Sequence, residues 1–200
     1  QVHGGPINHF RAGYDGTAFL DDVNFSVRAG EVFGILGGSG GGKSTILKHM
    51  IGLVPPVKGA VRFGGEDIVS ADGPDLERIR RRFGVMYQSG ALFGSMTLLE
   101  NVRLPIEVYT DLPDDAMTLL ARMKLGLVGL DQFTGHLPSE ISGGMQKRAG
   151  IARAMALDPS ILFLDEPTSG LDPVTSATLD ATVRRLAESL GVTFVIVTHD

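Results

Sequence analysis

A glycine-rich stretch that ends in Lys43-Ser44 has the spacing that points most directly to chemistry. Residues 37–44 read Gly-Gly-Ser-Gly-Gly-Gly-Lys-Ser and fit the pattern G-x-x-x-x-G-K-[ST]. Glycines let successive backbone N–H groups converge on phosphate oxygens, and a following helix adds the partial positive charge of its N-terminus. The pattern predicts that Lys43 reaches the β- and γ-phosphates of a nucleotide and that the Ser44 hydroxyl binds Mg²⁺. A flexible turn is the alternative, which the predicted strand before the loop and the helix after it disfavour.

Two adjacent carboxylates follow the apolar run of residues 161–164. Ligands of an open α/β sheet bind outside the carboxyl ends of its strands, so Asp165 is expected to bind Mg²⁺, directly or through water. Glu166 is expected to point to the other side of the pleat and to polarise an attacking water. A strand that ends in solvated acids is a common alternative. The two carboxylates indicate a metal and catalytic site only in combination with the phosphate loop.

A second glycine motif, Ser142-Gly143-Gly144, precedes a helical pattern over residues 146–157. Backbone N–H groups at a helix N-terminus bind anions, so the motif is a candidate second phosphate site. The alternative is an ordinary helix start with Ser142 as the N-cap. From these residues alone, the N-cap is the better interpretation.

The hydrophobic pattern predicts the elements that position these groups. Strands are expected twice within residues 19–36, the second buried, and at 60–63, 83–87, 161–164 and 192–197. Helices are expected at 44–51, 75–82 and 174–190. From 88 to 157 the pattern is mostly helical, with a capping box expected at Thr97 and weak points at Pro105, Pro113 and 126–129. Strands and helices thus flank a helical insert, which predicts an α/β fold with a largely parallel sheet and an appended helical sub-domain.

Composition narrows the function classes. The 200 residues are 43% hydrophobic, which is enough for one globular domain or for a core with a sub-domain. No apolar run exceeds four residues, whereas a membrane helix needs roughly 18, so this chain is not expected to span a bilayer by itself. A net charge of -5 argues against duplex nucleic acid as the main partner, although a local basic patch at Arg78 and residues 80–82 stays open. The absence of cysteine excludes disulfides and cysteine zinc sites and fits a cytosolic setting. Because the chain stops after a buried-type strand, the natural protein is expected to continue.

Together these motifs resemble those of the nucleotide-binding subunit of ATP-binding cassette (ABC) transporters, over essentially the whole chain. The resemblance assigns the Walker A loop to residues 37–45, the Q-loop to Gln88, the signature to 141–145, the Walker B strand to 161–165, the D-loop to 169–172 and the switch histidine to His199. It implies a P-loop NTPase (RecA-like) core of residues 1–87 and 159–200, with an N-terminal antiparallel β part. Residues 88–158 are then a helical sub-domain that carries the signature.

The resemblance also implies roles for individual residues. Catalysis is expected from Glu166, His199, Lys43 and Gln88, and Mg²⁺ binding from Ser44, Gln88 and Asp165. ATP binding is expected from Tyr14, Gly38, Ser39, Gly40, Gly41, Gly42, Lys43, Ser44, Thr45, Gln88, Ser142, Gly143 and Gly144. The Ser142 site is expected to contact the γ-phosphate of ATP held by a second copy, so that a head-to-tail homodimer encloses two ATP molecules.

Some positions leave alternatives or depart from the family pattern. Tyr14, 29 residues before Lys43, is the expected adenine-stacking ring and Phe10 is the alternative, although either ring could be an ordinary surface or core aromatic. Ile141 and Met145 stand where the family commonly has Leu and Gln, and Gly38 where many members have Pro. The motif's serine and glycines remain, so the phosphate contacts are expected to survive.

Residues 88–93 (Gln-Ser-Gly-Ala-Leu-Phe), the methionine that ends the signature and residues 138–140 (Pro-Ser-Glu) resemble the Mla/Mce-associated ATPases. These energise phospholipid or other lipid trafficking across an envelope. The resemblance implies a peripheral subunit on the cytoplasmic face of the inner membrane, with a multi-pass permease and lipid-binding accessory proteins as partners. The alternatives are an ABC ATPase for another substrate, a soluble ABC ATPase of DNA repair or translation, and a non-hydrolysing scaffold. Glu166 and His199 argue against the scaffold.

Overall fold

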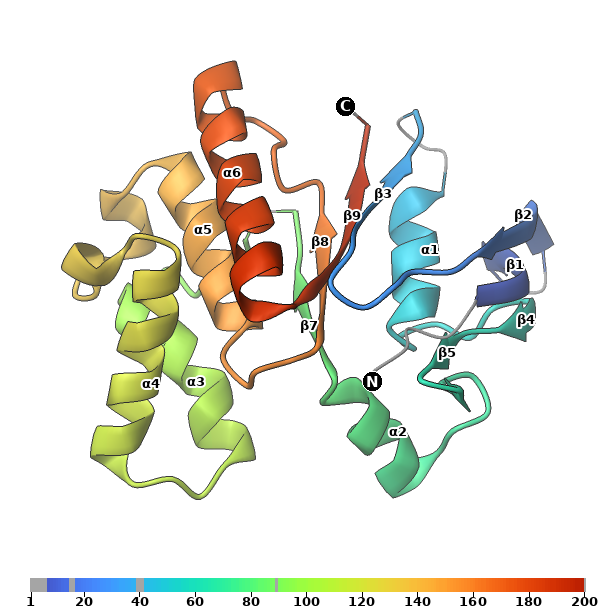
Figure 1. Cartoon of the computed structure of the whole chain (residues 1–200), viewed down its shortest axis with the longest axis horizontal. Coiled ribbons are helices and arrows are strands. Elements are labelled where there is room, and N and C mark those ends of the chain that lie inside the picture. The colour runs from blue at the N-terminus through green and yellow to red at the C-terminus, as the bar shows by residue number, and fades with distance from the viewer. Residues whose placement is uncertain (1–6, 15–16, 39–41, 89, 200) are drawn as a thin grey trace.

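The computed structural model describes residues 7–14, 17–38, 42–88 and 90–199, with side chains from residue 23 onward. Its centre is a parallel sheet in the order β3 (Val32–Leu36), β9 (Thr193–Thr198), β8 (Ile161–Asp165) and β7 (Phe83–Met86) (Figure 1). Because these strands are parallel, their carboxyl ends meet at one edge of the sheet, where ligands of such sheets bind. The largely parallel sheet predicted from the sequence is confirmed.

Helices cover both faces of this sheet. In Figure 1, α1 (Lys43–Met50) lies on one side, and α5 (Gly143–Ala154) and α6 (Pro173–Leu190) lie on the other. Strand β8 is buried at every position, and its side chains alternate between two hydrophobic cores. Leu162 and Leu164 pack in the core with α5 and α6, whereas Ile161 and Phe163 pack in the core with α1. The alternation follows from the two-residue period of a strand.

An antiparallel part precedes and follows α1 in sequence. Strands β1 (Ile7–Tyr14), β2 (Thr17–Phe25) and β4 (Lys58–Ala60) form a sheet in the order β2-β1-β4. Strands β5 (Arg62–Phe63) and β6 (Glu66–Asp67) form a hairpin, whose turn residues Gly64 and Gly65 have φ of +58° and +90°. Helix α2 (Gly73–Arg80) then leads into β7. Strand β1 is not among the strands expected from the hydrophobic pattern.

The segment between β7 and β8 is helical, as predicted. It contains α3 (Leu98–Tyr109), α4 (Asp114–Leu127), α5 and two short 3-10 helices, Asp131–Phe133 and Pro138–Glu140. The predicted capping box is present, because the Thr97 hydroxyl accepts from the N–H of Glu100 and the Glu100 carboxylate accepts from the N–H of Thr97. Pro105 lies inside α3. Among the described residues, no helix has both the length and the apolar character needed to cross a membrane.

Strand β3 was predicted to be buried, but one of its faces is exposed. Phe33 and Ile35 pack on the core with α1, but Val32 and Leu36 are 41% and 71% exposed. The core on the opposite face reaches β7, β8 and β9 and includes no residue of β3. Helices α5 and α6 therefore leave one face of this outer strand open to solvent.

Candidate active site

The phosphate loop leads directly into α1. Gly42, at the N-cap of α1, has φ +78°, a left-handed conformation that glycine adopts at little cost. The buried Lys43 ammonium donates to the carbonyl oxygens of Gly37 at 2.6 Å and Gly38 at 2.9 Å. These two contacts hold the lysine amine against Gly37 and Gly38, at the N-terminus of the helix. Ser39, Gly40 and Gly41 lie outside the described residues, and their phosphate contacts stay predictions.

Ser44 and Asp165 bring together the first turn of α1 and the end of β8. The Ser44 hydroxyl donates to Asp165 Oδ1 over 3.4 Å, and Asp165 is only 8% exposed. Burial, followed by the negative charge of Glu166, raises the pKa of Asp165 above its ordinary value, against the opposing effects of Ser44, Lys48 and Lys147. A hydroxyl beside a carboxylate is a donor set that suits Mg²⁺, which prefers oxygen ligands. A bound cation would also favour the charged carboxylate that burial disfavours.

Glu166 does not continue the strand, contrary to the expected pleat alternation. Strand β8 ends at Asp165, and Glu166 has φ +48°, which is uncommon for a residue with a side chain. Its N–H donates to the carbonyl oxygen of Val197 on β9 at 2.8 Å. The direction of its carboxylate is therefore set by a left-handed turn held from the neighbouring strand. Such strained backbone occurs often at functional sites.

Three of the four predicted catalytic side chains converge at this turn. His199 Nδ1 lies 2.5 Å from Glu166 Oε2, and Lys43 Nζ lies 3.9 Å from Glu166 Oε1. Glu166 is mostly shielded from solvent, whereas the His199 side chain is half-exposed. A carboxylate held between an imidazole and an ammonium can hold a water molecule and accept its proton.

Gln88, the fourth predicted catalytic residue, follows β7 and is exposed. Its side-chain amide donates to the Ser169 hydroxyl over 3.3 Å. This contact joins the Q-loop segment to the D-loop segment across 81 residues of sequence. The predicted part of Gln88 in Mg²⁺ binding stays a prediction.

The signature segment forms the start of α5. Ser142 is the N-cap, and its hydroxyl accepts from the N–H of Met145 at 3.3 Å, which confirms the N-cap interpretation within one chain. A Cβ on Gly144 would lie 2.3 Å from Cγ2 of Thr175 on α6, so the packing of α6 requires this glycine. A Cβ on Gly143 would make an ordinary contact of 3.5 Å with Leu171. The proposed contact with a second copy stays a prediction.

Two other predicted nucleotide contacts lie at the ends of described elements. Thr45 is buried in the first turn of α1. Tyr14 is the last residue of β1 and pairs with Thr17 on β2, and its side chain lies outside the described ones, as does that of Phe10. The choice between Tyr14 and Phe10 as the stacking ring stays a prediction.

Lys147 on α5 was missed by the sequence analysis. It is 7% exposed, and its ammonium donates to the backbone carbonyl oxygens of Gln88 and of Glu166, the latter at 3.3 Å. Burial lowers the pKa of Lys147, and the nearby carboxylates of Asp165 and Glu166 oppose that shift. Its spacing from the buried residues Gly144 and Ile151 places it on the inner face of a helix, which is a visible signal in the sequence.

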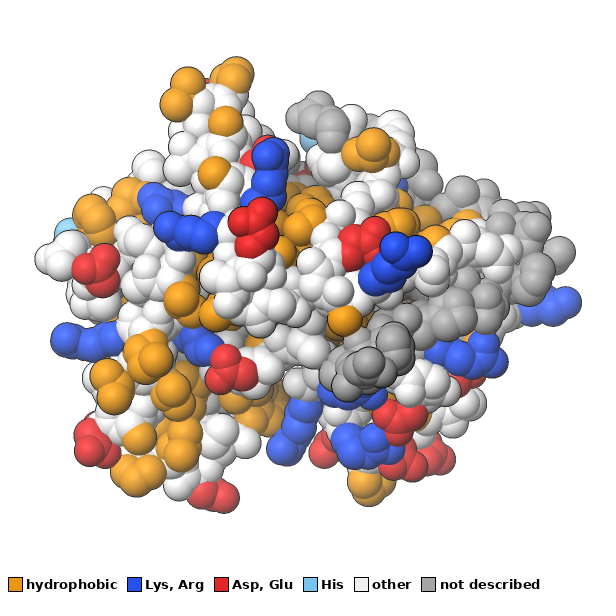
Figure 2. Space-filling model, in the orientation of Figure 1, with side chains coloured by type: hydrophobic (Ala, Val, Ile, Leu, Met, Phe, Trp, Pro, Cys, Tyr) orange, Lys and Arg blue, Asp and Glu red, His pale blue; other side chains and the backbone are white. Residues whose placement is uncertain are grey.

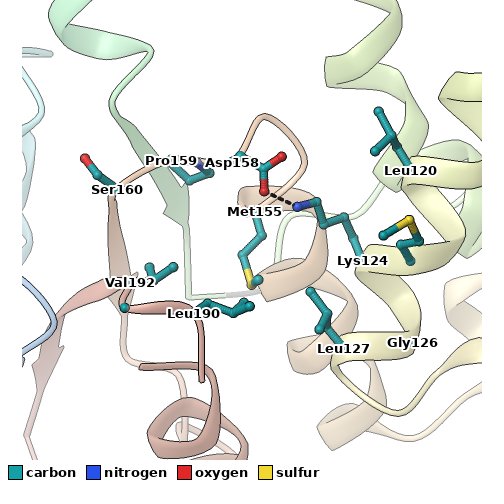
Figure 3. A pocket seen from close by; sticks show the side chains of 12 residues that line it. Leu120, Lys124, Gly126, Leu127, Met155, Asp158, Pro159, Ser160, Leu190 and Val192 are labelled. Atoms are coloured by element: carbon teal, nitrogen blue, oxygen red, sulfur yellow. Dashed lines mark hydrogen bonds and ion pairs between the residues drawn. The ribbon is translucent and has the colours of Figure 1, made fainter. Parts of the chain in front are cut away.

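A cavity of about 740 Å³ lies elsewhere (Figure 3). It is lined partly by Ser160 and Val192, which immediately precede β8 and β9, and so it lies at the opposite ends of these strands from Asp165 and His199. At its wall, Lys124 on α4 forms an ion pair with Asp158 (Figure 3). This cavity is therefore separate from the candidate active site.

Comparison with known protein families shows which family this chain belongs to. The family described as "ABC transporter" matches residues 20–169, well over half of the chain. The chain belongs to the ABC transporter family. Its fold is accordingly the P-loop ATPase fold that the resemblance implied.

Curated relatives in this family carry two different names. The "Probable ribonucleotide transport ATP-binding protein mkl" of Mycobacterium bovis is 42% identical over 194 residues, which are 97% of this chain and 54% of that protein. The "Intermembrane phospholipid transport system ATP-binding protein MlaF" of Escherichia coli K12 is 40% identical over 181 residues, or 90% of this chain and 67% of that protein. The chain thus spans about half the length of the mkl relatives that it matches.

Solved ABC structures have the same fold. The cbiO1 protein of Clostridium perfringens, part of the ABC transporter complex cbiONQ, superposes over the whole chain and 80% of its own length, with a TM-score of 0.91 and 28% identity. The cassette MJ0796, a dimer in a post-hydrolysis state with ADP and Pi, covers the whole chain and 88% of its own length, with a TM-score of 0.83 and 33% identity.

Proposed function

We propose that this ABC-family chain is the ATP-hydrolysing subunit of a transporter that moves phospholipid or a related lipid across a bacterial envelope. One observation carries the hydrolysis: Lys43, Glu166 and His199 converge beside the Ser44–Asp165 pair, where α1 meets the carboxyl ends of β8 and β9. A cation, a carboxylate base and an oxygen donor pair for a metal are the groups that phosphoryl transfer to water needs.

The phosphate loop binds the nucleotide in this proposal. Lys43 leaves the carbonyl oxygens of its own loop for the β- and γ-phosphates, whose negative charge it neutralises. Ser44 and Asp165, with Gln88, hold Mg²⁺, and the 3.4 Å contact between Ser44 and Asp165 supports this set. Bound Mg²⁺ supplies positive charge that offsets the charge of the phosphate oxygens.

Glu166 acts on the attacking water. Its carboxylate accepts the proton of that water or holds the water in line with the γ-phosphate. His199 donates a hydrogen bond to the same carboxylate at 2.5 Å, which supports an orienting role besides its predicted bond to the γ-phosphate. The bond that breaks is the one between the γ-phosphorus and the bridging oxygen, which departs with ADP.

Two copies assemble head to tail in this proposal. The N-terminus of α5 offers backbone N–H groups and partial positive charge beside the exposed Gly143 and Ser142, a setting that suits a phosphate from another copy. The dimeric solved structures of MJ0796 support this arrangement as a property of the family.

The membrane partner is a multi-pass permease that positions the dimer on the cytoplasmic face of the inner membrane. Large hydrophobic side chains are exposed at the end of α3 and along α4, among them Val108, Tyr109, Leu119 and Met123. Figure 2 shows orange side chains gathered over this part of the molecule, at the lower left. Exposed apolar patches mark protein or membrane contacts, which supports a binding partner there.

The lipid substrate has support from sequence similarity. Residues 88–93, residues 138–140 and Met145 match the Mla/Mce-associated pattern, and the MlaF relatives are named for phospholipid transport. The second candidate is a transporter of another substrate, because the mkl relatives are named for ribonucleotide transport at a similar identity. The two candidate functions have the same ATP hydrolysis and differ in the transported substrate.

The test uses the intact complex of the full-length protein and its membrane partner, reconstituted into phospholipid nanodiscs. We expect ATP turnover, co-purified phospholipid, and ATP-dependent transfer of a fluorescent phospholipid to acceptor vesicles. Lys43→Ala should abolish turnover and transfer and weaken ATP binding. If added ribonucleotides other than ATP stimulate ATP turnover and no lipid is transferred, the second candidate is favoured. Wild-type turnover in Lys43→Ala would remove the phosphate-loop assignment altogether.

A further inference from the structure

Lys147 has two hydrogen-bond partners that lie far apart in sequence. Its ammonium, on α5, donates to the carbonyl oxygen of Gln88, 59 residues away, and to that of Glu166, 19 residues away. Both acceptors are backbone atoms, so the contacts fix the path of the chain rather than the rotamer of a side chain. One residue thus fastens the signature helix to the Q-loop segment and to the turn that carries the candidate base.

Helix α5 also holds the Q-loop segment along its next turns. Arg153 donates to the carbonyl oxygens of Ala91 at 2.6 Å and Gly90 at 3.2 Å. A Cβ on Gly150 would lie 3.1 Å from the Cα of Gly90, so helix and loop approach more closely than most side-chain contacts do. The contact of Lys147 with Gln88 is therefore one of several contacts that attach the described residues of this segment to α5.

The second partner, Glu166, has a left-handed backbone, as do Ala91 and Asp158 among the described residues that are not glycine. Its φ of +48° costs free energy that the surroundings must offset. Its N–H donates to Val197, and its carbonyl oxygen accepts from the N–H of Ser169 at 3.2 Å and from Lys147 at 3.3 Å. Polar atoms on both sides of the Glu166 Cα are thus bonded, and these bonds hold the turn from which its carboxylate reaches His199.

We infer that Lys147 is a positioning residue, which ties the Gln88 segment and the Glu166 turn to the signature helix so that these elements move together. The inference rests on the proposed ATP hydrolysis and deepens it. A buried lysine suits the task, because an ammonium offers three donors and two backbone carbonyls accept from it here. A displacement of α5 by a second copy or a permease then reaches the backbone of the candidate base through one side chain.

The chain offers a matched control for this lysine. Lys124 is also 7% exposed and lies on a neighbouring helix, α4, where it forms an ion pair with Asp158 far from the active site (Figure 3). Replacing either lysine by methionine keeps an unbranched chain of similar volume and removes the donors. Lys147→Arg keeps charge and donors, and it is the rescue variant.

The kinetic test measures kcat and the KM for ATP in the intact complex. A displacement of about 1 Å at a reacting group can cost about a hundredfold in rate, so Lys147→Met should lower kcat by about tenfold to a hundredfold. The KM for ATP should change less than kcat, because Lys43, Ser44 and Asp165 are untouched. Lys147→Arg should recover most of kcat, and Lys124→Met should keep the wild-type kcat even where its melting temperature falls. If Lys147→Met does not fold, Lys147→Gln, a shorter side chain with one amide group, is judged by the same criterion.

Hydrogen–deuterium exchange tests the attachment of the Gln88 segment and the Glu166 turn to α5 without relying on ATP hydrolysis. Exchange should rise in Lys147→Met for peptides covering 87–92 and for peptides covering 165–170, and should stay at the wild-type level in both for Lys124→Met. Wild-type kcat in Lys147→Met, or a loss of kcat that Lys124→Met matches, would overturn the inference, as would unchanged exchange at both segments. A wild-type complex without ATP turnover would overturn the proposed function instead, and the exchange experiment would still decide the role of Lys147.

Discussion

Oε2 of Glu166 lies 2.5 Å from Nδ1 of His199. The two residues follow neighbouring parallel strands, β8 and β9, in which Asp165 pairs with Val197. The chains that leave these strands therefore emerge side by side, and the left-handed turn at Glu166 directs its carboxylate toward the imidazole. The pair depends on the sheet register, and one added or deleted residue in either strand would separate it.

His199→Ala should slow ATP hydrolysis, because the carboxylate loses the hydrogen bond that orients it and the γ-phosphate loses its predicted donor. We expect a loss smaller than the roughly 10²–10⁴-fold effect of removing a general base. Steady-state turnover of the complex measures it, with ATP affinity as the parallel readout. His136→Ala, in the helical segment beside Phe133, is the control and should keep wild-type turnover. Equal turnover rates in the two variants would exclude a role of His199 in ATP hydrolysis.

Ser142→Arg should block hydrolysis while the isolated subunit still binds ATP, if Ser142 contacts ATP held by a second copy. Mixed dimers make this test sharper. With Lys43→Ala in one copy and Ser142→Arg in the other, both defects fall in one composite site and the second site stays intact. With both substitutions in the same copy and a wild-type partner, each composite site carries one defect. Turnover should persist in the first dimer and disappear in the second, and equal turnover in the two would contradict assembly in trans.

Gly144→Ala should destabilise the fold, because the added methyl would lie 2.3 Å from Cγ2 of Thr175. Overpacking of this kind costs about 1–3 kcal/mol in the free energy of unfolding. Thr175→Ser removes that Cγ2 but keeps the hydroxyl that donates to Asp172, so the double variant should regain most of the loss. Gly143→Ala meets Leu171 at an ordinary 3.5 Å and should change the unfolding free energy less. Urea unfolding measures all four, and additive losses in the double variant would exclude the clash.

Asp165→Asn should raise the melting temperature measured without Mg²⁺ and nucleotide, while it abolishes hydrolysis. Burial and the charge of Glu166 raise the pKa of Asp165 in the folded state, so its ionised form is disfavoured there. The cost is present at neutral pH, where the side chain is charged in the unfolded state. It vanishes below the unfolded pKa of about 4, where both states are protonated. The gain over wild type should therefore shrink as the pH falls, and a gain that grows toward acid pH would contradict this reading.

Local patterns predicted much of the fold and of the site. The helix that begins at Lys43, the Thr97–Glu100 capping box and the strand before Asp165 are each encoded within a few residues, and the structure has each at the predicted place. Their order along the chain was enough to predict the helical insert and the parallel sheet. The half-exposed strand β3 was not predicted, because its exposure depends on how far α5 and α6 extend across the sheet.

Two features of the site depend on distant backbone atoms and escaped the sequence analysis. The two-residue period of β8 predicted that Glu166 would continue the pleat, but its N–H bonds to Val197, on another strand, and the chain turns instead. Lys147 stands out in the helical spacing of α5, yet its acceptors are backbone carbonyl oxygens, which no residue type reveals. Both are tertiary hydrogen bonds, and a pattern of side-chain types does not encode them.

The ATPase rate of the intact complex carrying Glu166→Gln tests the central claim most directly. The amide keeps the size of the carboxylate and much of its hydrogen bonding but cannot accept a proton, and Lys43, Ser44 and the loop amides are unchanged. We predict retained ATP affinity, turnover slower by about 10²–10⁴-fold, and an ATP-bound dimer that accumulates, with Glu188→Gln, an exposed substitution on α6, at the wild-type rate. Hydrolysis by Glu166→Gln at the wild-type rate would mean that Glu166 is only an acid at the end of a strand, and the account would be wrong.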